Sequence, residues 1–276
     1  MKILVIGASG MLAKPVVKKL DEAGFQIRLF SRSVKPSMYE KEYEIVNGDI
    51  FNKADLEKAM EDCDAIHITI SKTNEANAVK AIMEVAKSKQ IKLISYVSGA
   101  SVKEENTWFP MTGNKYLAEQ SIINSGIPYI IFRPTWFMES LGLMVRDGKA
   151  LMIGKQPNPS HWLAGEDFGQ MVATAYQKSE AHNGIFYCYG PESYLMKDAL
   201  KKYVNELHPE IIKISSVPIG MMKFMAFITG KKELKEVASM FAYFEKIGET
   251  ESNEETNKTL GNPEITLNQW LKSLKN

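Results

Sequence analysis

The first half of the chain alternates short apolar runs with segments of helical periodicity. Residues 2–7 form an apolar run that ends in a glycine, which is typical of a buried strand. Residues 11–23 then place apolar side chains at a helical spacing and stop before a glycine. The same pattern predicts further strands at 25–31, 43–49, 64–71, 92–98 and 128–134, and helices at 53–63, 74–89 and 113–125.

Beyond residue 135 the alternation weakens. The pattern there predicts a strand at 184–190, helices at 166–178, 196–207, 219–247 and 267–274, and a solvated loop in the polar run 248–262. Short connections between strands and helices favour parallel strands with right-handed crossovers. We therefore expect an α/β fold with a doubly wound, Rossmann-like parallel sheet in residues 1–150. Residues 151–276 would form a smaller C-terminal substrate lobe, interleaved with the first.

The turn between the first strand and the first helix, GASGMLA, contains small residues at Gly7, Gly10 and Ala13. Gly7 permits a sharp turn, Gly10 lets the backbone approach a ligand, and Ala13 keeps the helix close to the sheet. Free N–H groups and the dipole of the helix start favour a pyrophosphate. The turn therefore predicts a dinucleotide site made by Gly7, Ala8, Ser9, Gly10, Met11 and Leu12. The alternative is a tight turn without a ligand.

The end of the second predicted strand bears on the choice of cofactor. An NAD site usually has an acidic residue there, which accepts from the ribose 2′-hydroxyl. This chain has Ser31, Arg32 and Lys35 and no carboxylate. A guanidinium attracts a 2′-phosphate, which a carboxylate would repel, so NADPH is favoured over NADH. An ordinary basic surface cluster is the alternative.

The spacing of the small residues in the turn resembles that of the extended and atypical short-chain dehydrogenases/reductases. Members of this superfamily use Tyr-x-x-x-Lys on a helix and a serine after the fifth strand. Lys115 and Ser98 match that lysine and serine, and Ser101 is a second candidate for the serine. Met111 stands at the tyrosine position, and a thioether cannot transfer a proton. Tyr116 is turned about 100° from Lys115 around the helix and does not replace the phenol.

Three segments carry a narrower resemblance to the NmrA-like group of atypical NAD(P)-binding proteins: NSGIPYIIFRPTWFMESL at 124–141, AGEDFGQMVATA at 164–175 and GIFYCYGPESY at 184–194. This group often lacks the tyrosine. It contains reductases that depend on a lysine and cofactor-sensing regulators without turnover. The resemblance also implies that Asp49 and Ile50 lie near the adenine, although Asp49 is equally suited to capping the helix that follows.

Candidate substrate residues come from the second half. Trp136, Phe137 and Met138 are predicted to wall an apolar pocket, or else to be core, and His161 to reach the same pocket, or else to be incidental. The Met- and Phe-rich region 219–247 is compatible with a lid, a subunit interface or core, and we favour a pocket roof or core. Its apolar stripe also leaves partner binding open.

Composition excludes some classes of partner. The 276 residues carry a net charge of +1 and scattered lysines, so charge alone implies no nucleic acid and no membrane partner. The two cysteines, Cys63 and Cys188, lack metal-type spacing and are expected to be buried thiols, and no metal site is expected. The N-terminal apolar run is too short for a signal peptide or a span, so we expect a cytoplasmic location. A homo-oligomer stays open.

These observations favour an NADPH-dependent oxidoreductase that reduces a small quinone or reactive carbonyl, with Lys115 and Ser98 as catalytic residues. A quinone is electron-poor and needs little help from an acid, and hydride transfer is the chemistry of the cofactor. Met111 motivates the alternative of a non-catalytic NAD(P)-sensing regulator or scaffold. A sugar-nucleotide epimerase needs a competent acid and base, so Met111 argues against that class.

Overall fold

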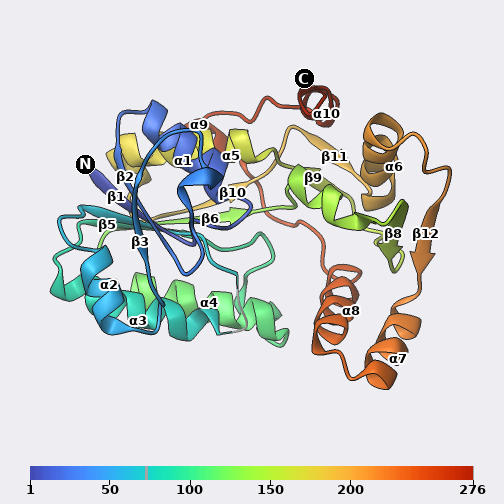
Figure 1. Cartoon of the computed structure of the whole chain (residues 1–276), viewed down its shortest axis with the longest axis horizontal. Coiled ribbons are helices and arrows are strands. Elements are labelled where there is room, and N and C mark those ends of the chain that lie inside the picture. Colours follow the sequence, from blue (N-terminus) through green and yellow to red (C-terminus); the bar gives the residue numbers. More distant parts are fainter. Residues whose placement is uncertain (72–73, 276) are drawn as a thin grey trace. The chain divides into compact units, whose positions relative to one another are not determined.

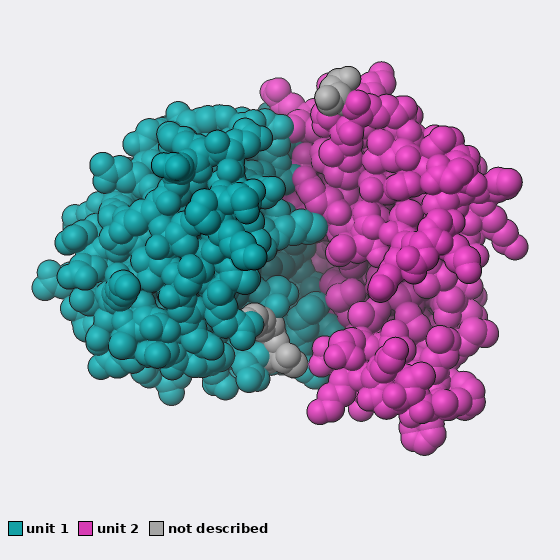
Figure 2. Space-filling model, viewed as in Figure 1, with its two compact units in different colours: residues 1–134, 165–188, 252–262 teal, residues 135–164, 189–251, 263–276 magenta. Residues whose placement is uncertain are grey.

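The computed structural model describes residues 1–71 and 74–275 of the chain. The chain forms two compact units, which Figure 2 shows in different colours. Unit 1 comprises residues 1–134, 165–188 and 252–262. Unit 2 comprises residues 135–164, 189–251 and 263–276.

Unit 1 is built on a seven-stranded parallel sheet with the strand order β10-β6-β5-β4-β1-β2-β3. The strands are β1 (Lys2–Ile6), β2 (Gln26–Ser31), β3 (Glu44–Asn47), β4 (Ala65–Ile68), β5 (Leu93–Val97), β6 (Tyr129–Pro134) and β10 (Gly184–Cys188). The order reverses between β1 and β4, which is the switch point where such sheets bind ligands. The predicted doubly wound α/β fold is therefore confirmed.

Helices cover both faces of this sheet (Figure 1). One face carries α2 (Lys53–Ala59), α3 (Glu75–Ser88) and α4 (Pro110–Ile123), and the other carries α1 (Ala13–Glu22), α5 (Gly165–Gln177) and α9 (Glu254–Leu260). Short 3-10 turns η1 (Pro36–Met38), η2 (Glu104–Asn106) and η4 (Ser179–Ala181) complete the unit. Because both faces are covered, the inner strands are continuous apolar runs, as in β1, where Ile3 through Ile6 are fully buried.

Unit 2 contains two small sheets and five helices within the described residues. The strands are β7 (Val145–Arg146), β8 (Lys149–Ile153) and β12 (Ile214–Val217) in one sheet, and β9 (Ser160–Trp162) and β11 (Glu192–Tyr194) in the other. The helices are η3 (Met138–Met144), α6 (Met196–Leu207), α7 (Ile219–Thr229), α8 (Lys232–Phe244) and α10 (Leu267–Ser273). Nowhere in residues 1–71 and 74–275 does a helix have the length and apolar content that crossing a bilayer demands.

The structure divides the chain differently from the predicted boundary at residue 150. Residues 135–150 fall in unit 2, whereas 165–188 and 252–262 fall in unit 1. The reason is that β10 pairs with β6 at the edge of the large sheet, while α5 packs against α1.

Three local predictions are wrong in detail. Helix α1 begins at Ala13 rather than residue 11, because the turn continues to Leu12. The predicted helix 219–247 is two helices, interrupted at Gly230, whose φ of +66° is left-handed. The polar run 248–262 was expected to be a loop, but it contains α9, which buries Thr256 and Leu260.

Candidate functional site

The turn after β1 lies at the switch point of the sheet and is closely packed against the chain that follows β4 and against β2. Gly7 has a φ of +92°, a conformation that residues with a Cβ rarely adopt. A Cβ there would lie 2.1 Å from the carbonyl oxygen of Thr69, just beyond β4. The Gly7 N–H donates to the carbonyl of Phe30 in β2 at 3.0 Å. Glycine is therefore required at position 7 by the fold itself.

The same turn leaves backbone donors open at the start of α1. Gly10 donates to the Gly7 carbonyl at 2.8 Å, and Ala13 donates to the Gly10 carbonyl at 3.1 Å. Among the described residues, no acceptor is found for the N–H groups of Ser9, Met11 and Leu12. Leu12, the N-cap of α1, supplies no side-chain cap. Open N–H groups at a helix start suit a phosphate, so this turn fits the pyrophosphate of a dinucleotide.

The segment after β2 is fastened onto this turn by two side chains. The hydroxyl oxygens of Ser33 and Ser9 lie 3.2 Å apart, and the Tyr39 hydroxyl donates to the Ala8 carbonyl at 2.6 Å. Burial raises the pKa of Tyr39, which keeps its hydroxyl protonated as a donor. Tyr39 was not among the predicted site residues, because a single tyrosine in a polar connection gives no local signal for this contact.

This segment presents two unpaired cations. Arg32 and Lys35 are exposed, and within residues 1–71 and 74–275 neither side chain has an ion-pair or hydrogen-bond partner. The Ser31 hydroxyl accepts from the Ser33 N–H at 3.2 Å. A free guanidinium beside the glycine turn suits the 2′-phosphate of NADP, whereas the ribose hydroxyls of NAD would give it no anion to bind.

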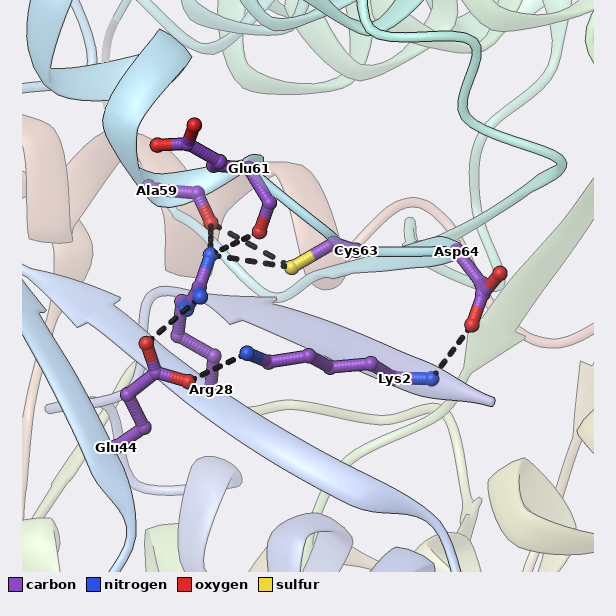
Figure 3. A network of polar contacts seen from close by, with 7 residues as sticks. All are labelled: Lys2, Arg28, Glu44, Ala59, Glu61, Cys63 and Asp64. Carbon is purple, nitrogen blue, oxygen red and sulfur yellow. Dashed lines mark hydrogen bonds and ion pairs between the residues drawn. The ribbon is translucent and has the colours of Figure 1, made fainter.

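Arg28, four residues earlier in β2, is held in a different way (Figure 3). Its side chain is buried, with 7% exposed, and its Nη2 lies 2.7 Å from a carboxylate oxygen of Glu44. Glu44 is also 2.6 Å from Lys2 Nζ. The other end of the guanidinium meets the carbonyls of Ala59 and Glu61 and the sulfur of Cys63. Arg28 therefore serves the packing of unit 1.

Asp49 and Ile50 follow β3. The Asp49 carboxylate accepts from the Phe51 N–H at 3.0 Å, and the Asp49 N–H donates to Asp55 at 2.8 Å. The cap of α2 is Asn52, whose side chain accepts from the first turn of the helix. Asp49 therefore does not cap the helix. Contact of Asp49 and Ile50 with adenine stays a prediction.

Lys115, on α4, is tied to a buried carboxylate. Its Nζ lies 2.8 Å from Glu75 at the start of α3 and donates to the Val97 carbonyl at 3.2 Å. The Tyr96 hydroxyl donates to the same Glu75 oxygen. Only 1% of the Glu75 side chain and 11% of the Lys115 side chain are exposed. The ammonium of Lys115 is therefore neutralised within unit 1, and its catalytic role stays a prediction.

Tyr96 does not replace the phenol that Met111 lacks. Burial and the nearby Glu75 carboxylate both raise the pKa of Tyr96 well above its ordinary value, so its proton is held. Glu75 and Tyr96 were not among the predicted site residues. Glu75 resembles an ordinary acidic residue in the first turn of a helix, and Tyr96 lies within an apolar strand.

Ser98, after β5, is also tied to a buried carboxylate. Its hydroxyl donates to Glu119, which is fully buried on α4. Arg133 binds the same carboxylate in a bidentate manner, at 2.6 and 3.0 Å, and donates to the Tyr187 hydroxyl at 2.6 Å. Ser98 thus closes a hydrogen-bonded chain between β5, α4, β6 and β10. This arrangement stabilises the sheet edge, and a catalytic role for Ser98 stays a prediction.

The predicted apolar pocket residues belong to unit 2. Met138 is fully buried and Phe137 is 8% exposed. Met138 lies in the core cluster of unit 2, so the core alternative describes it. Trp136 is partly exposed and stacks on Phe241, with 6.1 Å between the ring centroids. Trp136 also packs against this core but is less buried than Phe137 and Met138, and its contact with a substrate stays a prediction.

His161 is oriented by a carboxylate from the polar run that was expected to be a loop. Its Nδ1 lies 2.7 Å from Glu249, and its backbone N–H donates to both oxygens of that carboxylate. The Thr135 hydroxyl also donates to Glu249, and the imidazole stacks on the ring of Tyr189. Glu249 was missed because it is 88 residues from His161 and no local pattern links them.

Comparisons with known proteins agree with this geometry. The profile of the NAD(P)H-binding family matches residues 7–157. The photosystem II assembly factor Ycf39 of Trieres chinensis is 21% identical over 245 residues, which span 83% of this chain and 76% of that protein. The NADPH-dependent quinone oxidoreductase QOR2 of Escherichia coli, solved with NADPH, has a TM-score of 0.76 at 18% identity over 99% of this chain and 100% of its own.

The UDP-glucuronic acid 4-epimerase of Bacillus cereus, solved with NAD, has a TM-score of 0.74 at 15% identity and full coverage of both chains. Likenesses at such low identity show the fold, and these two proteins differ in cofactor and reaction. The match to the family profile covers more than half of the 276 residues. The chain therefore belongs to the NAD(P)H-binding family.

Proposed function

We propose that this chain is an NADPH-dependent oxidoreductase that reduces a small quinone. The observation that carries the proposal is Arg32, an exposed guanidinium without a partner among the described residues, at the end of β2. The Ser33 contact with Ser9 fastens this segment to the glycine turn. In the proposal, the open N–H groups of the turn hold the pyrophosphate, and Arg32 and Lys35 hold the 2′-phosphate. When bound, NADPH supplies a hydride.

The state of the polar side chains supports a quinone over a simple aldehyde. Met111 cannot donate a proton, and Lys115 and Ser98 are each paired with a buried carboxylate. Reduction of an aldehyde forms an alkoxide, which is a far stronger base than a phenolate, so an acid must assist. Reduction of a quinone forms a phenolate-type anion of pKa about 10, which takes its proton from solvent. Reactive carbonyls remain the secondary substrate class.

A non-catalytic NAD(P)-sensing regulator or scaffold is the second candidate. The pairing of Lys115 with Glu75 favours it, because the residue expected to act in catalysis is neutralised. The relative from Trieres chinensis is called an assembly factor, which names a role other than turnover for that protein. An epimerase is disfavoured, because sugar epimerisation needs an acid and base that Met111 does not supply.

Trp136 and His161 are the proposed substrate contacts of unit 2. Trp136 is a partly exposed aromatic side chain that stacks on Phe241, and His161 is held in one orientation by Glu249. The proposed location is the cytoplasm, and the two free, buried thiols of Cys63 and Cys188 fit a reducing compartment.

The experiment is an NADPH oxidation assay with a panel of quinones and a panel of aldehydes, followed by absorbance. We expect turnover with quinones. The variant Arg32→Ala should raise the KM for NADPH about tenfold or more with little change in kcat, because it removes charge-assisted hydrogen bonds. Arg146→Ala, which removes an exposed arginine of unit 2, is the matched control. Tight NADPH binding without NADPH oxidation across both panels would overturn the proposed oxidoreductase activity and support the non-catalytic regulator.

A further inference from the structure

Helix α7 of unit 2, drawn in orange in Figure 1, exposes apolar side chains over most of its surface. Its buried residues are Met222 and Ala226, one turn apart. The exposed side chains, which we call the α7 apolar face, are Met221, Phe224, Met225, Phe227 and Ile228, with 45–85% of each exposed. Four of them follow the spacing i, i+3, i+4, i+7, which aligns them on one side of a helix. The core interpretation therefore holds for Met222 but not for the five residues of the α7 apolar face.

The segment around this face is rich in lysine. Residues 211–232 contain four lysines and no aspartate or glutamate, a net charge of +4, while Glu210 directly precedes the segment and Glu233 directly follows it. All four lysines are exposed: Lys213, Lys223, Lys231 and Lys232. Exposed lysines thus lie on and beside a helix whose apolar side chains face outward, a combination that the net charge of the chain does not reveal.

We propose that the α7 apolar face docks on an anionic membrane surface, with α7 lying in the plane of the interface. An apolar helix face flanked by lysines is the arrangement of interfacial helices, in which the rings enter the acyl boundary and the ammonium groups meet lipid phosphates. The 11 residues of α7 are too few to span a bilayer, which needs about 20. This proposal stands independently of the proposed reductase activity.

Charge distinguishes this occupant from a second copy of the chain. A symmetric dimer through α7 would bring two sets of the same four lysines to one interface, and like charges would oppose the contact. Anionic headgroups neutralise those lysines instead. The expectation of no membrane partner depended on net charge and on the absence of a spanning segment, and neither reports on a local surface.

The first experiment is co-sedimentation of the full chain with vesicles of phosphatidylcholine alone or of equal parts phosphatidylcholine and phosphatidylglycerol. We expect binding to the anionic vesicles that weakens as salt is raised. The double variant Phe224→Ser/Phe227→Ser should weaken it about tenfold or more, because two rings lose their apolar environment. Leu143→Ser, at a leucine that is 79% exposed outside α7, should leave it unchanged.

A second pair of variants tests the charge. Lys223→Glu/Lys232→Glu should weaken vesicle binding about tenfold or more. Lys197→Glu/Lys201→Glu, on exposed positions of α6, changes the net charge equally and should have little effect. Absence of binding to anionic vesicles would overturn the proposal. An equal loss of vesicle binding in the two double lysine variants would also overturn it. A dimer in sedimentation equilibrium that Phe224→Ser/Phe227→Ser dissociates, without vesicle binding, would assign the face to a second copy.

Discussion

Arg28 and Arg32 stand four residues apart along β2 and its exit, and they are used in opposite ways. Arg28 is buried and bound to a carboxylate, two carbonyls and a thiol (Figure 3). Arg32 is exposed and has no partner among the described residues. The sequence does not predict this difference, because Arg28 lies within the predicted strand 25–31 and Arg32 directly follows it. Burial and the positions of Glu44 and Cys63 decide it.

The same contrast separates two regions of unit 1. At the glycine turn, backbone donors and two cations are open to a ligand. Elsewhere in the unit, Lys115 on α4 is bound to the buried carboxylate of Glu75, and Ser98 after β5 is bound to that of Glu119. Unit 1 therefore leaves the groups that we propose to bind phosphate unpaired, while the groups expected to handle protons are engaged in the fold. Such a division suits hydride transfer to an acceptor that needs no strong acid.

The largest expected effect tests whether Lys115 is structural. Lys115→Met leaves the Glu75 carboxylate buried without its cation, which should cost about 3–5 kcal/mol of the free energy of unfolding. Adding Glu75→Gln should restore much of this loss, because the amide oxygen still accepts from Tyr96 and no charge is buried. Chemical denaturation of the single and double variants measures both.

Lys92→Met is the matched control for Lys115→Met. Lys92 also pairs with a carboxylate, Asp64, at 2.7 Å, but its side chain is 74% exposed, so the loss should stay below about 1 kcal/mol. Equal costs for the two lysine variants would show that Lys115 is as free as a surface lysine and would remove the contrast between the two regions.

The next effect concerns the turn on the open side of the comparison. Gly7→Ala should destabilise the fold by about 2–4 kcal/mol. A residue with a Cβ is strained at the positive φ of this position, and the new Cβ would clash with the Thr69 carbonyl. Gly24→Ala shares the positive φ, +84°, but meets no atom within 4 Å, so it should cost about 1–2 kcal/mol. Thermal or chemical unfolding measures both losses of stability. Equal losses would mean that the backbone around Thr69 shifts to accommodate the new Cβ.

The smallest effect concerns the acid sensitivity of the Arg28 network. The hydrogen bond from Arg28, with a second from Lys2, holds the pKa of Glu44 below its ordinary value of 4.5. Because the folded protein favours the carboxylate, its contribution is present above pH 4.5 and is lost as the pH falls through the lowered pKa. Glu44→Gln should therefore flatten the loss of stability on the acid side.

Unfolding curves recorded from neutral pH to below pH 4.5 measure this change in slope. Glu42→Gln, at an exposed position just before β3, removes the same charge and serves as control. A Glu44→Gln profile that superimposes on the unmodified one would show that Arg28 is held by its backbone acceptors alone.

Local patterns were sufficient for the sheet and for the turn. Apolar runs predicted all seven strands of unit 1, and the spacing of Gly7, Gly10 and Ala13 predicted the turn at the switch point. These features depend on residues that are neighbours in sequence. The sequence was compatible with an unpaired Arg32, but only the structure shows that Arg32 is exposed while Arg28 is buried and paired.

Contacts between distant residues were not predictable in this way. Glu75 is 40 residues from Lys115, and Glu249 is 88 residues from His161, so neither pairing leaves a periodic signal. The strands of unit 2 are two to five residues long, which is too short for alternation to show. For the apolar residues of α7 a pocket roof or core was favoured, because hydrophobicity alone does not distinguish a buried face from an exposed one.

Calorimetric titration of the unmodified chain with NADPH and with NADH tests the central claim most directly. The open turn and the unpaired Arg32 predict that NADPH binds at least about tenfold more tightly than NADH, and that Arg32→Ala narrows this gap while Arg146→Ala does not. Equal affinities of the unmodified chain for the two nucleotides, or binding of neither at millimolar concentration, would contradict the account.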